Sequence, residues 1–553
     1  MPMPPIRVIS ALFLLTALLF SSCAGSGSGS GSPFQSPPMD RAASAWKVLG
    51  KEKLTPFSRE VAVSRYREAV TDIIQKLSTQ PPHQWPNTVT LPGRDGPWNV
   101  QIDPGIARGS GHEVWNPALI DKVRPLALET RRTPEYSRLR RKGVGAPYLA
   151  IHKPRDGEAT RKFTPDKGQY LPMTALVQFD GPQQATLKLA DPRELSEVLA
   201  GDRPWPVAAD FSMPVRKSLQ PATFVRATVG GLMRPGDYVS RNGLYLMEPY
   251  RADKVPIIFV HGLMADPHIW QAHAAALMAD PELGPRIQCW YYVYPTGLPV
   301  VSSSTWFRQA LAELKQRVDP EGNDPAFQNI LVVGHSMGGL IARMQVTESK
   351  DLFWKTWFAS APEHLKLSAP LRDELRNMLI FRANPDVKRI IFMNTPHRGS
   401  RMAGSWLGRW GSSMVRTPGQ MVDLVTAVAR LDVAHLNPNR GRFDGFGVDG
   451  IKSMQPDHPL ISDLSRQPIR AKYHTIIGEL FETSDLTKSS DGVVPYESAH
   501  LDGAESEMIV PSWHGDVTNR RTINEIRRIA RLHVLGKAAA DRRDSGPDSD
   551  ASR

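Results

Sequence analysis

The chain has 553 residues, of which 41% are hydrophobic and 22% charged, and its formal net charge is +12. That length allows one large domain plus a substantial extension, and the apolar content excludes an intrinsically disordered chain. Only two cysteines occur, Cys23 and Cys289, so a framework of several disulfides is also excluded.

The N-terminus carries a predicted export signal. Arg7 precedes an apolar stretch that ends at Phe20, too short for a membrane-spanning helix but suited to a signal-peptide core. Small residues then precede Cys23, which resembles the bacterial lipobox, although Phe20 replaces its usual leucine. We predict a signal peptide over residues 1–22, lipidation at Cys23 and a Gly-Ser-rich tether over 23–39, hence a lipid-anchored protein of the bacterial cell envelope. Ordinary signal-peptidase cleavage, giving a secreted protein, is the alternative.

Residues 40–170 are predicted to form an N-terminal extension of helices and loops. Apolar residues at helical spacing predict a helix over Arg59–Leu77. From Pro81 to Pro147 the chain is rich in Pro, Gly and Trp, which favours loops packed over another surface. Loose alternation over Leu171–Leu189 predicts one or two strands, and we expect them to open a catalytic domain over residues 171–536.

Several β-prone runs follow. Gly243–Met247 predicts a strand ahead of the run Val255–Val260, which ends in His261-Gly262-Leu263. Ile287–Tyr292 predicts another strand, in which Cys289 is a buried apolar residue.

The run Ile330–Ala342 predicts a strand, a sharp turn and a helix around a Gly-x-Ser-x-Gly motif at residues 334–338. This setting is typical of a nucleophile elbow, where glycines let the strand and the helix pass close to the turn. Ser336 is therefore the predicted nucleophile, and an ordinary structural turn is the alternative. An oxyanion needs two N–H donors, and we expect the amides of Met337 and Leu263 to supply them.

A serine hydroxyl needs a base and an orienting acid, which follow it in the order acid, then histidine. The strand-like run Tyr473–Gly478 leads to Asp491, and the run Glu507–Pro511 leads to His514. Each residue lies just past the carboxyl end of a predicted strand, where open α/β sheets place their sites. Asp491 and His514 complete the predicted triad, while His261 comes too early and is interpreted as a loop-shaping residue. The competing acids and base are Glu479, Asp485, Asp502 and His500.

Two insertions are placed to affect the substrate. The first, Asp351–Pro385, carries aromatic residues and a predicted helix over Leu371–Phe381. The second follows Ser400, where an amphipathic stripe from Met421 to Leu431 predicts a helix that either covers an acyl pocket or packs on the core. We expect a cap or lid over about residues 400–470.

A helix is predicted over Asn519–Val534, followed by a disordered tail over 537–553. This helix carries several arginines, and a second basic cluster lies over residues 131–142. Nucleic acid is not the expected partner, because an export signal takes the chain away from it. Anionic lipid headgroups or a solvated surface fit these clusters better. The sequence indicates no oligomeric state.

Four segments together resemble an α/β-hydrolase of the bacterial lipase/esterase type: residues 261–262, 334–338, 394–400 and 490–495. The resemblance covers about residues 243–536. It implies an α/β fold, with a mostly parallel central sheet flanked by helices, helical cap insertions and an N-terminal extension. It also implies hydrolysis of a lipid or other acyl ester through an acyl-enzyme, with no metal and no organic cofactor. The alternatives are a phospholipase or acyltransferase with the same triad, or a catalytically inactive envelope interaction protein.

Overall fold

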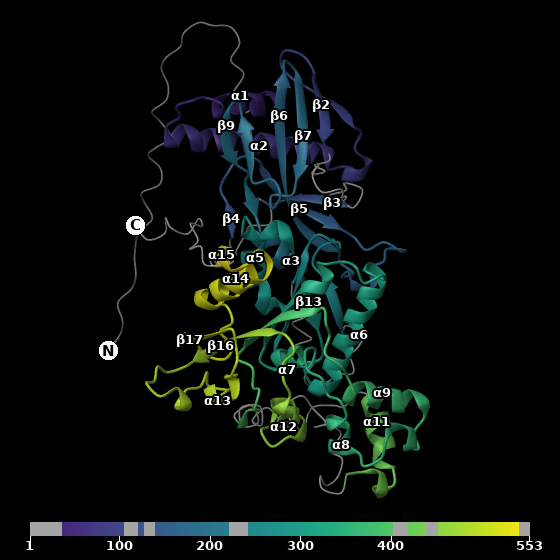
Figure 1. Cartoon of the computed structure of the whole chain (residues 1–553). Coiled ribbons are helices and arrows are strands. Elements are labelled where there is room, and N and C mark those ends of the chain that lie inside the picture. The colour runs from purple at the N-terminus through teal and green to yellow at the C-terminus, as the bar shows by residue number, and fades with distance from the viewer. Residues whose placement is uncertain are drawn as a thin grey trace, which may run out of the picture.

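A computed structural model describes residues 36–103, 120–126, 139–219, 242–401, 419–437 and 452–540. The predicted signal peptide, Cys23, most of the tether, parts of the expected cap and most of the C-terminal tail lie outside the described residues. Figure 1 shows an N-terminal part at the top and, below it, a larger part that contains the predicted triad and is therefore called the catalytic part. Among the described residues, no helix has the length and apolar character needed to cross a membrane.

The N-terminal part is an α+β body with its own core, which differs from the expected loops. Helices α1 (Pro38–Leu49) and α2 (Pro56–Leu77) pack on a six-stranded sheet of order β1-β2-β7-β6-β5-β3. Its strands are β1 (Thr88–Leu91), β2 (Trp98–Asp103), β3 (Lys122–Pro125), β5 (Ala146–His152), β6 (Gln169–Gly181) and β7 (Gln184–Ala190). The expected boundary between residues 170 and 171 is wrong, because it falls inside β6, which pairs with β5 and β7.

Helix α2 confirms the predicted helix and shows how it is held. It begins at Pro56 because the Thr55 side chain caps it, accepting the N–H of Ser58. The apolar stripe predicted from the sequence faces the sheet. Within that stripe, the buried Tyr66 hydroxyl donates to the carbonyl oxygen of Val177 and accepts its N–H, both at 2.7 Å. Apolar burial and paired hydrogen bonds therefore fix α2 on strand β6.

Shorter elements connect this body to the catalytic part. Two small ladders pair β4 with β10 and β8 with β9. Helix α3 lies between β6 and helix α5 of the catalytic part. The bounds are β4 (Arg140–Arg141), β8 (Glu197–Ala200), β9 (Arg203–Pro206), β10 (Ala209–Asp210), α3 (Ser212–Ser218) and α5 (Gln271–Ala279).

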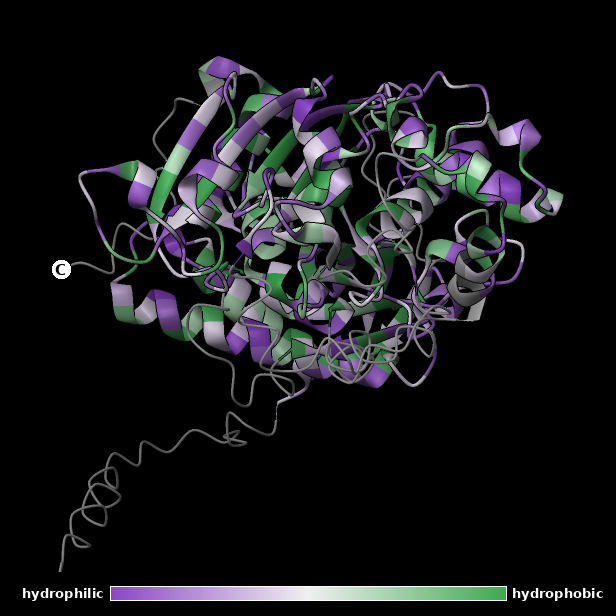
Figure 2. Cartoon of the chain, turned by 90° about the horizontal axis from the view of Figure 1, so that it is seen from below, coloured by the Kyte–Doolittle hydropathy of each residue, from purple (hydrophilic) through white to green (hydrophobic). Residues whose placement is uncertain are grey.

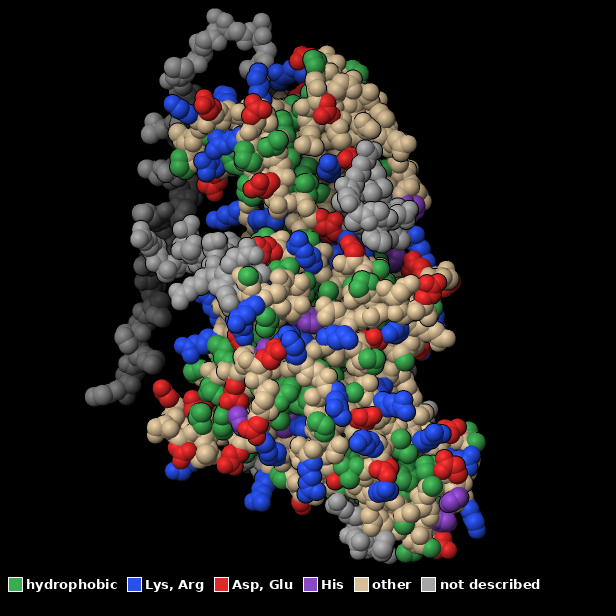
Figure 3. Space-filling model, viewed as in Figure 1, with side chains coloured by type: hydrophobic (Ala, Val, Ile, Leu, Met, Phe, Trp, Pro, Cys, Tyr) green, Lys and Arg blue, Asp and Glu red, His purple; other side chains and the backbone are tan. Residues whose placement is uncertain are grey.

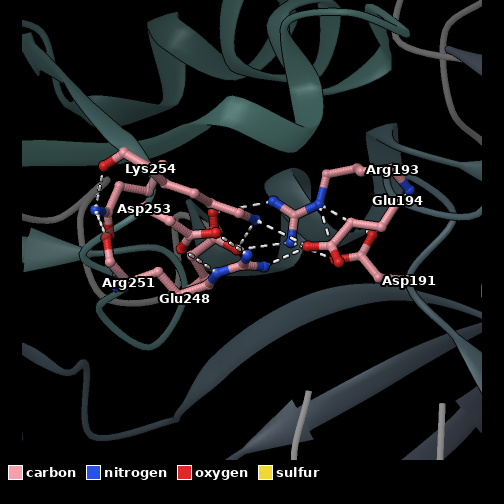
Figure 4. A network of polar contacts seen from close by, with 8 residues as sticks. Asp191, Arg193, Glu194, Glu248, Arg251, Asp253 and Lys254 are labelled. Atoms are coloured by element: carbon pink, nitrogen blue, oxygen red, sulfur yellow. Dashed lines mark hydrogen bonds and ion pairs between the residues drawn. The ribbon is translucent and has the colours of Figure 1, made fainter. Parts of the chain in front are cut away.

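A buried charge network joins the two parts, as Figure 4 shows. The Arg193 guanidinium donates to Asp191 Oδ2 at 2.7 Å and to Glu248 Oε2 at 2.6 Å. Lys254, which is fully buried, places its Nζ 3.4 Å from the same Glu248 oxygen. Burial alone would raise the pKa of Glu248, but these cations hold it below its ordinary value. The Glu248 carboxylate is therefore held in its charged form by buried cations that hydrogen-bond to it.

Replacing Arg193 by methionine is expected to destabilise the protein by about 3–5 kcal/mol, because two buried carboxylates lose their main partner. Urea unfolding of the full chain measures this change. The control is Lys162→Met, which breaks an exposed ion pair between the same two parts, Lys162 with Glu313. Exposed pairs contribute little, so that variant should unfold close to the wild type. Equal stability of Arg193→Met and the wild type would contradict the role given to this network.

The catalytic part is built on a seven-stranded sheet of order β11-β13-β12-β14-β15-β16-β17. Strand β11 pairs antiparallel with β13, and every other pairing is parallel. This confirms the predicted α/β fold class. The strands are β11 (Gly243–Leu246), β12 (Val255–Val260), β13 (Ile287–Val293), β14 (Ile330–His335), β15 (Val387–Met393), β16 (Lys472–Glu479) and β17 (Ser506–Pro511).

Helices cover both faces of this sheet. Alternate residues of each strand point to opposite faces, so that Ile258 packs toward α6 and α7 while Ile257 packs toward α5 and α14. The buried central strands therefore read as continuous apolar runs, and Figure 2 shows hydrophobic residues gathered toward the middle of the molecule. The remaining flanking helices are α6 (Val300–Val318), α7 (Met337–Arg343), α13 (Tyr496–Ala499), α14 (Arg520–Leu535) and α15 (Lys537–Ala540). The tail predicted to be disordered is expected to begin at residue 537, but residues 537–540 form helix α15.

The insertions form helices at the lower end of the view in Figure 1. They are α8 (Leu352–Trp357), α9 (Ala369–Leu379), α11 (Gly419–Ala429) and α12 (Pro459–Arg466). Leu424 and Val428 of α11 are buried in the same core as Leu375 and Met378 of α9. Within the described part of the expected cap, Leu424 and Val428 of the amphipathic stripe are therefore buried in the hydrophobic core.

Two arginines of α14 have acidic partners. Arg531 donates to Asp280 at 2.7 Å, and Arg528 donates to Glu525 at 2.7 Å. On the face drawn in Figure 3, basic and acidic side chains are interspersed. This favours the interpretation of the basic cluster on α14 as part of a mixed surface; most of the basic cluster over residues 131–142 lies outside the described residues.

Candidate active site

The predicted nucleophile lies at a strained turn. Ser336, between β14 and α7, has φ of 52° and ψ of −122°, a left-handed backbone that non-glycine residues rarely adopt. A Cβ added at Gly338 would lie 2.4 Å from the carbonyl oxygens of Val260 and His261. One added at Gly334 would lie 2.7 Å from the Gly338 oxygen. The close approach of strand and helix therefore requires both glycines of the motif.

The structure brings Ser336, His514 and Asp491 together at the carboxyl ends of neighbouring strands. His514 Nε2 lies 2.9 Å from Ser336 Oγ, and His514 Nδ1 lies 2.7 Å from Asp491 Oδ2. The other Asp491 oxygen accepts the N–H groups of Val493 and Val494 at 2.9 and 2.7 Å. The carboxylate is thus fixed by the backbone on one side and faces the imidazole on the other. This order can move the serine proton onto the imidazole.

The competing residues are engaged elsewhere. The Glu479 carboxylate accepts the Ser489 hydroxyl and the N–H of Thr483, both at 3.2 Å. Asp485 caps the short 3-10 helix that follows it. His500 lies between Glu507 and Asp502, at 2.7 and 3.2 Å. None of these competing side chains hydrogen-bonds Ser336 or His514 within the described structure.

The two expected oxyanion donors flank the nucleophile. Met337 is the first residue of α7, where helix geometry leaves the N–H without an intrahelical acceptor. Leu263 lines the cleft beside Ser336. A Cβ added at Gly262 would lie 3.0 Å from Ser336 Cβ, so the loop that carries Leu263 abuts the elbow. Both amides therefore stay the predicted donors.

His261 has a structural environment. Its ring stacks on Tyr294 with centroids 4.4 Å apart, and its Nδ1–H donates to the Gly262 oxygen at 3.0 Å. The Tyr294 hydroxyl donates to the His261 oxygen at 2.6 Å. Burial lowers the pKa of His261 to about 4, so the ring is neutral at neutral pH. These contacts agree with a loop-shaping role.

A cavity of about 550 Å³ opens beside Ser336 and His514. Its walls are mainly apolar, formed by Leu263, Ile269, Pro396, Met454, Leu480, Val493, Val494, Trp513 and Val517. Two wall residues reach the surface, since Leu480 is 42% and Trp513 57% exposed, and the neighbouring Phe481 is 78% exposed. An apolar cavity with few polar groups besides the triad suits a hydrocarbon chain better than a sugar or a peptide.

The segment 394–400, noted in the sequence only for its resemblance, holds the loop that carries Asp491. Ser400 donates its hydroxyl hydrogen to the Val493 oxygen. Arg398 donates to the carbonyl oxygens of Glu497 and His500 at 2.6 and 2.7 Å. These are contacts between distant segments, which no local pattern in the sequence indicates.

Burial lowers the pKa of six described histidines: His335 (to about 3), His261, His273, His474 and His533 (to about 4 each), and His397, whose pKa lies well below its ordinary value. Unfolding returns them to water, where their ordinary pKa is 6.5. Below pH 6.5 the unfolded chain therefore binds protons that the folded chain does not, and stability falls as the pH drops toward 4. We expect the Tm to fall steeply over that interval, measured by calorimetry in a pH series. His273→Gln should flatten the fall, and a Tm independent of pH there would contradict the neutral buried rings.

No group of three or more metal-ligating side chains is arranged as a metal site in the ranges that the structure describes.

A model of the alpha/beta hydrolase family matches residues 257–514, from β12 to the predicted base. No curated protein matches the sequence. Among solved structures, the chain is similar to the mature lipase BlEst2 of Bacillus licheniformis, with 17% identity, a TM-score of 0.29 and coverage of 50% of this chain and 92% of that one. It is also similar to butyrate-bound esterase Est2 of Thermogutta terrifontis, with 16% identity, a TM-score of 0.28 and coverage of 53% and 88%. Because these TM-scores are low, the fold assignment rests on the family match and the strand order.

Proposed function

We propose that this chain, whose residues 243–536 have the α/β-hydrolase fold, is a serine hydrolase that cleaves carboxylic esters through an acyl-enzyme. The hydrogen-bonded line from Ser336 through His514 to Asp491, at 2.9 and 2.7 Å, carries this proposal. The line ends in a mainly apolar cavity, where an acyl chain can lie beside the nucleophile. The alpha/beta hydrolase match supports hydrolysis as the reaction class.

In the first half of the reaction, Ser336 Oγ attacks the acyl carbon while His514 Nε2 takes the hydroxyl proton. Asp491 accepts the Nδ1–H of the ring and stabilises the imidazolium. The amides of Met337 and Leu263 stabilise the oxyanion of the tetrahedral intermediate. The C–O bond to the alcohol then breaks, and His514 gives its proton to the leaving oxygen. Water repeats the sequence on the acyl-enzyme, releasing the acid and restoring Ser336.

We propose a lipid or other long acyl ester as the substrate. The apolar wall of the cavity continues onto the exposed rim formed by Leu480, Phe481 and Trp513. Exposed aromatic and aliphatic side chains of this kind suit contact with lipid, because tryptophan favours the boundary between water and hydrocarbon. The acyl chain would lie along the wall and leave the cavity over this rim.

We further propose that lipidation of Cys23 tethers the enzyme to the bacterial envelope. The support is the sequence pattern of the first 23 residues. Between Cys23 and Ser36, the first described residue, the chain can span up to about 45 Å when extended. That reach would let the rim approach the membrane that carries the anchor. Labelling with a radioactive fatty acid in cells, lost in Cys23→Ala, tests the anchor separately from the chemistry.

Hydrolysis of p-nitrophenyl esters from acetate to palmitate by the full chain in detergent tests the proposed reaction and substrate class. We expect esters longer than acetate to give the highest kcat/KM. Trp513→Ala should lower kcat/KM for the long esters more than for acetate, while Phe57→Ala, which also removes an exposed aromatic ring but on the N-terminal body (76% exposed), should not. Absence of ester cleavage would contradict the function. A product formed with an added alcohol would assign acyl transfer instead.

A further inference from the structure

The backbone of His514 is held at both ends. Its N–H donates to the Asp491 carbonyl oxygen at 2.9 Å. Its carbonyl oxygen accepts two side-chain donors, His335 Nε2 at 3.0 Å and Asn394 Nδ2 at 3.3 Å. His335 immediately precedes Ser336 in the chain. The main chain of the base is therefore hydrogen-bonded by His335, the residue before the nucleophile, and by Asp491, the acid of the triad.

Asn394 is built into this position. It follows β15 directly, is 4% exposed and has a positive φ of 50°. Its Oδ1 accepts the N–H of Gly478, at the end of β16, at 2.7 Å, while its Nδ2 faces the His514 oxygen. The side chain thus spans from β16 to the histidine loop. Asparagine tolerates a left-handed backbone better than most residues, but such a conformation in a buried residue indicates a specific use.

The strain is concentrated around the site. Five non-glycine residues in the described chain have positive φ, and three of them, Met264, Ser336 and Asn394, lie just after the adjacent strands β12, β14 and β15. The other two lie elsewhere: Gln183 is between β6 and β7, and Lys350 comes shortly before α8. Strained backbone persists where the surrounding structure holds it, and it clusters at functional sites.

His335 is suited to act as a neutral donor. It is 5% exposed, and burial lowers its pKa to about 3. The ring can therefore carry its single proton on Nε2, toward the His514 oxygen, without placing a second cation beside an imidazolium. Its Nδ1 has no hydrogen-bond partner among the described residues, so the ring's hydrogen bond is the one from Nε2 to the His514 oxygen.

We propose that His335 and Asn394 are positioning residues, which set the distance between His514 Nε2 and Ser336 Oγ by holding the His514 carbonyl oxygen. This inference rests on the proposed function. Because His335 is covalently joined to Ser336, its hydrogen bond ties the nucleophile loop directly to the histidine loop. Asn394 ties the same oxygen to the central sheet. Losing these donors lets the histidine loop drift, and a misplacement of about 1 Å can cost about 100-fold in rate.

The test is steady-state hydrolysis of p-nitrophenyl butyrate by the full chain, with kcat expressed per active site titrated by a fluorophosphonate. His335→Met removes one donor at similar volume. Asn394→Asp removes the other, while keeping the acceptor for Gly478 and tolerance of positive φ. We expect each single variant to lower kcat about 10-fold, and the double variant about 100-fold, with KM changed less than 3-fold.

Rescue and a matched control separate positioning from folding. His335→Gln keeps an N–H donor within reach and should recover kcat to within about 3-fold of the wild type. The control is His533→Met, which breaks another histidine-to-carbonyl bond, from His533 Nε2 to the Asn329 oxygen at 2.7 Å, just before the other end of β14. It should lower the Tm and leave kcat per site unchanged.

Two results would overturn the inference: single variants that keep kcat within 2-fold of the wild type, or a loss in His533→Met as large as that in His335→Met. Neither result would contradict the proposed function, provided that the fluorophosphonate labels the wild type and the wild type hydrolyses the ester. A wild type that is neither labelled nor active would instead refute the proposed function itself.

Discussion

Replacing Ser336 by alanine is expected to lower kcat for ester hydrolysis by about 10⁶-fold, leaving only the slow background reaction. Ser336 Oγ is the atom that His514 Nε2 contacts in the described structure, at 2.9 Å, and alanine offers no atom to attack the acyl carbon. The elbow itself should persist, because alanine also has a single Cβ and the close approach of strand and helix depends on the glycines.

Kinetics with p-nitrophenyl butyrate and a thermal unfolding curve, run on the same preparation, measure this effect. We expect a Tm within a few degrees of the wild type. Ser303→Ala is the matched control, since it removes the hydroxyl of another buried serine, on helix α6. That variant should keep kcat within about 2-fold. Activity of Ser336→Ala above one hundredth of the wild type would show that another group is the nucleophile.

Asp491→Asn is expected to lower kcat by about 10⁴-fold. The carboxylate accepts the Nδ1–H of His514 at 2.7 Å, and this contact leaves Nε2 free to take the serine proton. An asparagine amide turned toward the ring would donate instead of accepting, which favours the wrong tautomer. The other oxygen would still accept the Val493 and Val494 N–H groups, so the loop should keep its shape.

The control for this change is Glu479→Gln, the same removal of charge on the rival acid at the end of β16. Glu479 is 8% exposed, and its carboxylate bonds Thr483 and Ser489 rather than the triad. We expect kcat to stay within about 3-fold. If Glu479→Gln were the more damaging substitution, the acid of the triad would have to be reassigned.

The strands of the catalytic sheet could be predicted because short stretches of sequence are enough to indicate each of them. Continuous apolar runs predict β12, β13 and β14, and the glycines around Ser336 predict the turn that follows β14. The chain order of nucleophile, acid and base then selects Asp491 and His514. The structure brings those three side chains into hydrogen-bonding contact.

The N-terminal body could not be predicted in the same way. Its strands β1 and β3 have four residues each, and the sequence around them is rich in Pro and Gly, a pattern typical of loops. The predicted domain boundary between residues 170 and 171 is wrong for a related reason. The alternation over Leu171–Leu189 correctly predicts strands, but nothing local shows which sheet they join.

The support around the triad was also hidden from the sequence. His335 looks like the variable residue of the Gly-x-Ser-x-Gly motif, and Asn394 lies 120 residues before His514, whose carbonyl oxygen both side chains contact. These contacts exist only once β14, β15 and β17 lie in one sheet.

The most direct test of the central claim is to react the full chain with a fluorophosphonate and locate the adduct by mass spectrometry. A fluorophosphonate reacts with a serine that an adjacent base has activated, so it reads the proposed chemistry without a known substrate. We expect one stoichiometric adduct, on Ser336, and none in His514→Ala. An adduct on another serine, or no adduct on a protein shown to be folded, would contradict a serine hydrolase centred on Ser336.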